Sequence, residues 1–304
     1  MRWQLKNSSS LYFDAFDIHY LLLQPVLLED VTLHYTSVGN REVDISHLEE
    51  AKQRWNAEND RRSLCGQPAL EANPLYRPIT AAYADGTLTI GAGITTYFDN
   101  FYLQTSSDGW DDNTIVGAGL SVVLVCRDEQ ILIGKRSGVV ASGTGKFHVS
   151  GGHAHPAPDF VSVPATLTEA ALQELGEEMQ IQNADVRQLR FLGLAIDLIR
   201  SKPEFIIEAD LKEESAEYIS RWQAHVSQEK SADKSQEEFT ELRCLASILE
   251  ANDGSSYGPE KEAPFSLTGF WQQREHFVPA CQAALMAFWL CHSGAKIEKI
   301  PKLT

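Results

Sequence analysis

The sequence contains few cysteines and no long apolar segment. Five of its 304 residues are cysteine, and none forms a Cys-x-x-Cys pair. This argues against a disulfide framework and a cysteine-bound zinc ion. No stretch reaches the roughly 18 uncharged apolar residues that a membrane helix requires, and the first residues lack the apolar segment of a secretory signal. We therefore expect a cytoplasmic protein without a membrane partner.

Basic residues are also scarce. The chain has 26 Lys and Arg against 42 Asp and Glu, a formal net charge of −16. A surface this acidic repels the phosphate backbone of nucleic acids, so a nucleic-acid partner is disfavoured. A few basic side chains could still form a local pocket for a small phosphorylated ligand. The length allows one large domain or two small ones, and the sequence carries no signal for an oligomeric state.

Residues 1–113 are expected to form an N-terminal α+β extension that contributes to the substrate pocket. The segments that indicate it are a strand at 31–37, a charged helix near 45–59 that starts after Asp44, a hairpin of 77–83 with 87–94, and an aromatic helix at 97–103. The hairpin is expected because Ala84-Asp85-Gly86 places an Asp-Gly turn between two strand-like runs.

Residues 114–304 alternate strand-like and helix-like segments. Strands are predicted at 116–126, 130–135, 147–149, 189–197 and 204–211, and helices near 166–180, 214–226 and 277–292. This order favours a layered α/β sandwich. Residues 137–145 are rich in glycine and serine, which indicates a flexible loop. Residues 229–238 are highly charged, and we interpret them as a solvated excursion from the fold.

The most informative segment is the helix that contains Glu174, Glu177 and Glu178. These residues stand at i, i+3 and i+4, so their carboxylates share one face of the helix. Clustered carboxylates repel one another unless a cation neutralises them, and Mg²⁺ commonly binds a few carboxylates together with substrate phosphates. Taken alone, three such glutamates more often form a solvated acidic face, and it is their context that favours a metal site.

The order of a strand, Gly151-Gly152, a loop and this helix resembles the Nudix hydrolase family. The box of that family ends in Arg-Glu-apolar-any-Glu-Glu-any-Gly-apolar, and residues 173–181 match it at the glutamates and at both apolar positions. The chain departs from the box at Gln173, where the family has Arg, and at Gln180, where it has Gly. The upstream glutamate of the box is replaced by Ala165, and the loop is longer.

A second resemblance covers roughly residues 70–290 and concerns the UDP-sugar pyrophosphatase branch of the family, which also has a lengthened box with Gln in place of Arg. The matching stretches are 93–99, 116–119, 135–137, 149–153, 172–174 and 204–205. The resemblance implies a Nudix α/β/α sandwich with a mixed sheet. It also implies hydrolysis of UDP-glucose or UDP-galactose to UMP and a sugar 1-phosphate, with Mg²⁺ or Mn²⁺ as cofactor.

The resemblance assigns roles to the acidic residues. Glu174 and Glu178 match the metal ligands, and Glu177 completes the catalytic group as a third ligand or by holding a metal-bound water. Gln173 could orient Glu174 through a hydrogen bond. Glu204 is either a base that activates water or a surface carboxylate at a strand edge.

Four residues are expected to bind substrate. Arg136 ends a strand, where its guanidinium could grip a phosphate with two hydrogen bonds. The resemblance places His148 and His153 in the substrate pocket, and Tyr97 could stack on uracil or bond the ribose. Without the resemblance, we would interpret Tyr97 as a core residue and the histidines as structural.

Two other functions remain open from the sequence. The substrate could be another nucleoside diphosphate compound, such as ADP-ribose. The chain could also be a catalytically silent Nudix fold that senses a nucleotide. The retained glutamates argue against silence, whereas the missing box arginine and upstream glutamate leave it open.

Overall fold

The structure is a computed structural model. It describes residues 9–13, 18–22, 26–27, 31–35, 45–67, 69–84, 87–105, 117–138, 143–153, 155, 167–197, 202–229, 238–251 and 265–293. The predicted helix start at Asp44 and the turn at Asp85-Gly86 lie outside these residues.

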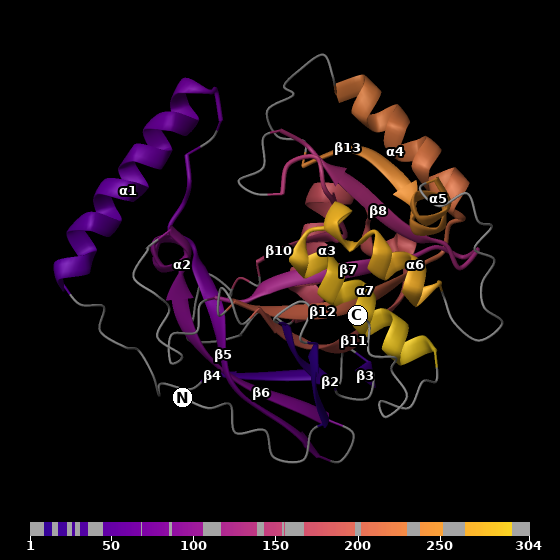
Figure 1. The fold of residues 1–304 in the computed structure, drawn as a ribbon, viewed down its shortest axis with the longest axis horizontal. Helices are drawn as coiled ribbons and strands as arrows, with labels where there is room; N and C mark the ends of the chain where they lie inside the picture. Colours follow the sequence, from indigo (N-terminus) through magenta and orange to yellow (C-terminus); the bar gives the residue numbers. More distant parts are fainter. Residues whose placement is uncertain are drawn as a thin grey trace.

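A mixed sheet forms the centre of the described structure (Figure 1). Its strands run in the order β1-β2-β11-β12-β7-β8-β13, with β3, β9 and β10 paired beside this path. Strands β12 and β7 are parallel, and the other neighbours are antiparallel. The bounds are β1 (Ser9–Phe13), β2 (Ile18–Leu22), β3 (Val26–Leu27), β7 (Gly119–Val125), β8 (Ile131–Arg136), β9 (Phe147–His148), β10 (Ser150–His153), β11 (Val186–Asp197), β12 (Lys202–Leu211) and β13 (Phe239–Cys244).

Helices cover both faces of this sheet. They are α3 (Leu167–Met179), α4 (Ser215–Glu229), α5 (Leu245–Ala251), α6 (Leu267–Gln272) and α7 (Pro279–His292), with short 3₁₀ turns at Asn183–Asp185 and Arg274–His276. Strand β7 shows the division, because Leu120 and Val122 pack in one core cluster with α3 and α4, whereas Val123 and Val125 pack in another with α5, α6 and α7. A strand buried on both faces reads as a continuous apolar run, which is why the sequence predicted it. The expected α/β sandwich with a mixed sheet is confirmed.

A smaller sheet of β4 (Val31–Tyr35), β6 (Thr87–Thr96) and β5 (Pro74–Ala84) stands beside the main one, together with α1 (Ile45–Leu64) and α2 (Tyr97–Thr105). The predicted hairpin is confirmed as the antiparallel pair β5–β6. Strand β5 docks on the main sheet, because the amide of Ala118 donates to the carbonyl of Tyr76 at 2.6 Å. Strands β1 to β3 pair within the main sheet instead, so the first 113 residues contribute to both sheets. The boundary at residue 113 stays a prediction.

The indole of Trp55 on α1 meets three rings of α2 edge to face, those of Tyr97, Phe98 and Phe101. These contacts attach α1, seen at the left of Figure 1, to α2.

Among the described residues, no helix carries an apolar stretch long enough to cross a bilayer.

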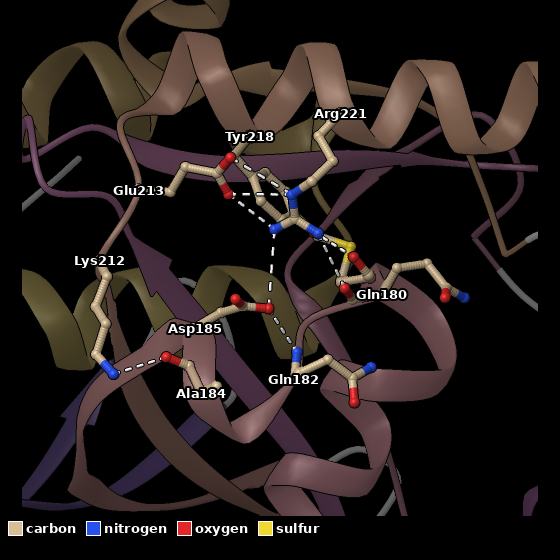
Figure 2. A network of polar contacts seen from close by, with 9 residues as sticks. Gln180, Gln182, Ala184, Asp185, Lys212, Glu213, Tyr218 and Arg221 are labelled. Carbon is tan, nitrogen blue, oxygen red and sulfur yellow. Dashed lines mark hydrogen bonds and ion pairs between the residues drawn. The ribbon is translucent and has the colours of Figure 1, made fainter.

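The C-terminal end of α3 is held by α4 (Figure 2). Gln180 has φ +56°, a left-handed conformation in which glycine is favoured. Glycine would adopt this conformation without steric strain. Arg221 donates to the carbonyl of Gln180 at 3.2 Å and pairs with Glu213 at 2.8 Å, and the Tyr218 hydroxyl donates to the carbonyl of Met179. The strained helix end is therefore fixed by contacts from the neighbouring helix.

We expect Gln180→Gly to stabilise the protein by about 0.5–1 kcal/mol, because glycine relieves the left-handed strain but loses more backbone entropy on folding. Gln180→Val should lower the stability, since a branched side chain tolerates positive φ least. Urea unfolding of the three proteins measures both effects. A lower midpoint for the glycine variant would show that Gln180 is not strained.

Candidate active site

Two glutamates of α3 bind the backbone of β10. Oε2 of Glu178 accepts hydrogen bonds from the Ser150 hydroxyl at 2.9 Å and the Gly151 amide at 2.8 Å. Oε1 of Glu174 accepts one from the amide of His153 at 3.2 Å. Both glutamates therefore point at the strand, and the strand's own donors hold them in place.

The two glycines of β10 make this approach possible. A Cβ atom on Gly152 would lie 2.3 Å from Oε1 of Glu174, and one on Gly151 would lie 1.9 Å from the carbonyl oxygen of Leu120 on β7. Real Cβ atoms do not approach other atoms so closely, so a side chain at Gly152 would displace the Glu174 carboxylate, and one at Gly151 would displace the backbone of β7. The Gly151-Gly152 pair, expected to end a strand, instead lies within β10.

The site disfavours negative charge as it stands. Burial raises the pKa of Glu174 to about 7, and the nearby charges of Glu177 and Glu238 also raise it, whereas the His153 amide opposes the shift. Burial raises the pKa of Glu178 well above its ordinary value, and its hydrogen bond with Glu238 adds to the shift. The described residues supply neither glutamate with an ion-pair partner, so these carboxylates favour either protons or a cation.

The donor set fits a hard divalent cation. Glu174 and Glu178 offer carboxylate oxygens, and Mg²⁺ commonly takes only one or two carboxylates, the remainder being water and substrate phosphate. Within the described part of the chain, no three His, Cys, Asp or Glu side chains form a group that could hold a metal ion. The protein's contribution to a metal site would therefore be the pair Glu174 and Glu178.

Glu177 lies apart from this pair. Its side chain is exposed, and Oε1 accepts a hydrogen bond at 2.9 Å from the amide of Gln173, which is exposed as well. Gln173 thus contacts Glu177, and among the described residues no hydrogen bond joins its side chain to Glu174. The role of Glu177 as a third ligand or water holder stays a prediction.

Glu238 is a site residue that the sequence did not reveal. We interpreted residues 229–238 as a solvated excursion, but the Glu238 side chain is only 23% exposed and pairs with Arg136 at 2.6 Å. It also shares a hydrogen bond with Glu178. Glu238 thereby connects the predicted phosphate-binding arginine to a predicted metal ligand. A charged segment gave no signal of this, because the contact depends on the pairing of β13 with β8.

The remaining predicted substrate residues lie at the ends of β9 and β10. His148 is buried, and Nδ1 has no hydrogen-bond partner among the described residues. Burial, followed by the charges of Arg136 and Lys202, lowers the pKa of His148 well below its ordinary value. His153 is half-buried and meets the ring of Tyr97 edge to face, with 5.2 Å between centroids. The structure thus brings Tyr97 to His153, and Arg136 to Glu238.

Glu204 occupies the start of β12. It is 6% exposed, so the interpretation as a surface carboxylate is wrong. Oε1 accepts a hydrogen bond from the Ser121 hydroxyl at 2.7 Å. Side chains alternate along a strand, and Phe205 packs with α3 whereas Ile206 packs with α7. Glu204 therefore lies on the α7 face of the sheet, opposite the face that α3 covers.

No protein-family model matches the chain, and no curated protein matches it. Several solved structures are similar to about half of the chain, and three of them illustrate the match. A protein from Deinococcus radiodurans is 13% identical with a TM-score of 0.31, and the match covers 49% of this chain and 80% of that one. A MutT protein from Methanosarcina mazei is 17% identical with a TM-score of 0.29, over 44% of this chain and 80% of that one. A Nudix hydrolase from M. smegmatis is 16% identical with a TM-score of 0.26, over 52% of this chain and 81% of that one. Scores this low do not assign the chain to a family.

The raised pKa of Glu174 predicts a specific dependence of stability on pH without metal. The unfolded carboxyl group loses its proton near pH 4.5 and the folded one near 7, so between these values the folded state binds more protons. Stability should therefore fall as pH rises through this window, by up to about 3 kcal/mol from this residue. Urea unfolding in chelator should show a shallower decline for Glu174→Gln, and identical slopes would contradict the shift.

Proposed function

We propose that this protein is a Nudix-type hydrolase that cleaves the diphosphate of a nucleotide sugar. The observation that carries the proposal is the pair of half-buried carboxylates, Glu174 and Glu178, held against the backbone of Gly151 and His153. Removing two like charges from water without a cation costs free energy. Packing of the fold alone gives no reason to place two carboxylates together in this way. A divalent cation and a substrate diphosphate together supply a reason for the arrangement.

Glu174 and Glu178 would hold Mg²⁺, with Mn²⁺ as an alternative. When bound, such an ion neutralises phosphate oxygens and lowers the pKa of a bound water. The protein's own residues orient these ligands, because Ser150 and the amides of β10 fix the carboxylate oxygens before substrate arrives. Preorganised ligands need not reorient when the reaction occurs, which favours catalysis.

Arg136 would bind the diphosphate. Its side chain is 13% exposed and pairs with Glu238, so substrate phosphate would compete with that carboxylate for the guanidinium. A guanidinium suits this task because its planar donors match phosphate oxygens with two parallel hydrogen bonds. Exchange of Glu238 for phosphate would also free Glu238 from Arg136 beside the proposed metal ligands.

The uridine and sugar parts of the proposal come from the resemblance to the UDP-sugar pyrophosphatase branch. Tyr97 supports it physically, because its half-buried aromatic ring is held between Trp55 and His153 and could stack on a base. His148 and His153 remain in the proposed substrate group. UDP-glucose and UDP-galactose are the proposed substrates, cleaved to UMP and sugar 1-phosphate.

Hydrolysis should require a divalent cation, and Glu178→Gln should lower kcat by orders of magnitude because it removes one anionic ligand. Circular dichroism should show an unchanged fold. The matched control is Glu169→Gln, an exposed glutamate on the same helix, which should keep full activity. Normal turnover by Glu178→Gln, or full wild-type activity in excess chelator, would refute the proposed metal site.

UDP-glucose and UDP-galactose should be better substrates than ADP-ribose and dinucleoside polyphosphates. A wrong base leaves donors or acceptors of the pocket unpaired, at roughly 1–3 kcal/mol each. Arg136→Ala should weaken all diphosphate substrates alike, whereas Tyr97→Ala should reduce the preference for uracil. Phosphate release with a coupled phosphatase measures these rates. Equal or faster turnover of ADP-ribose would leave the Nudix proposal without its UDP-sugar substrate.

A further inference from the structure

A second polar group lies on the sheet face opposite the proposed metal ligands. It consists of Glu204 and Lys202 at the start of β12, Ser121 on β7 and His153 on β10. One oxygen of the Glu204 carboxylate is fixed by the Ser121 hydroxyl at 2.7 Å. The other, Oε2, lies 3.6 Å from Nζ of Lys202, which exceeds a normal hydrogen-bond length. No described residue donates a hydrogen bond to that oxygen.

Gly119 leaves room on the sheet beside this oxygen. In the strand register, Gly119 pairs with Glu204 on one side and with His153 on the other. A Cβ atom on Gly119 would lie 2.0 Å from Oε2 of Glu204. The carboxylate thus leans across the β7 backbone toward the strand that carries His153.

Lys202 and His153 complete the group. Burial lowers the pKa of both His148 and His153, and the positive charge of Lys202 adds to the shift in each. The side chain of Lys202 is 25% exposed, and its ammonium forms no hydrogen bond with a described residue. The His153 ring meets Tyr97, while the His153 amide holds Glu174. One residue therefore links this group to the proposed metal ligands.

We propose that Glu204 and Lys202 bind neighbouring hydroxyl groups of a sugar ring in the substrate. A hydroxyl can donate to the open oxygen of Glu204 and accept from the ammonium of Lys202, so a vicinal diol satisfies both. A phosphate would be repelled by Glu204, and an amine by Lys202. This inference rests on the proposed function, and the diol is either the 2′,3′-diol of the ribose or the 2,3-diol of the sugar beyond the diphosphate.

A purely structural ion pair would explain the group less well. Lys202 and Glu204 do form an ion pair at 3.6 Å, but this distance leaves the hydrogen-bonding capacity of both groups open to a ligand. Here Ser121 holds one carboxylate oxygen, and the lysine stays beyond hydrogen-bond distance from the other. The role of Glu204 as a base that activates water stays a prediction.

The test compares Glu204→Gln and Lys202→Met with the wild type on three ligands: UDP-glucose, UDP-2-deoxyglucose and 2′-deoxy-UDP-glucose. Calorimetry measures binding, and turnover gives KM and kcat. Both variants should bind UDP-glucose about tenfold or more weakly, as expected for a lost hydrogen bond to a charged group, with kcat little changed. The wild type should bind the analogue that lacks the contacted hydroxyl about tenfold more weakly than it binds UDP-glucose. The variants should bind that analogue with the same affinity as the wild type. That analogue identifies the ring.

The matched control is Glu208→Gln, a buried carboxylate on the same strand that pairs with Arg190 and His292 and should leave binding unchanged. Three results would each overturn the inference. The variants could lose the same affinity on all three ligands, Glu204→Gln could bind UDP-glucose as tightly as the wild type does, or the wild type could bind none of the ligands. Failure of the proposed function is distinguishable, because the wild type would then discriminate the deoxy analogues in calorimetry without hydrolysing any ligand.

Discussion

The close contact between helix α3 and strand β10 is the constraint on which the candidate site depends. The Glu174 carboxylate reaches the backbone of β10 because Gly152 carries no side chain, and β10 lies close to β7 because Gly151 carries none. The same helix buries Leu175 and Met179 in the core, so its depth is set by apolar packing. The approach of Glu174 and Glu178 follows from that depth. Core packing and the polar site are therefore one arrangement, and a change in either would shift the other.

Charge is distributed in a way that the overall composition conceals. The chain carries a net charge of −16, yet Glu174 and Glu178 at the site are half-buried and repel each other. Arg136 and Lys202 approach this region from two different strands. A ligand that brings a divalent cation and a diphosphate would supply counter-charges to both kinds of group. The site is thus electrostatically incomplete as the protein alone provides it, which is typical of sites organised around a bound ion.

Long periodic segments were predictable from the sequence. Strands β7, β8, β11 and β12 and helices α1, α3, α4 and α7 lie where periodicity placed them, within a few residues at the ends. Strands β1 to β3 and β13 were not predicted. Strand β13, for example, has the sequence FTELRC and becomes a strand through its pairing with β8. Short strands of this kind depend on partners that are distant in the chain, so their local sequence carries little signal.

The sequence by itself determined the helix with its three glutamates, the double glycine before it and the alternation of strands and helices. These features follow from local spacing, which needs no knowledge of distant contacts. Only the tertiary structure decided that Glu174 and Glu178 turn toward β10 while Glu177 stays exposed. It also decided that Glu238 joins Arg136, and that Glu204 and His153 line up across Gly119. These pairs are far apart in the chain and meet through strand register and helix packing, which long-range hydrogen bonds and buried apolar contacts set together.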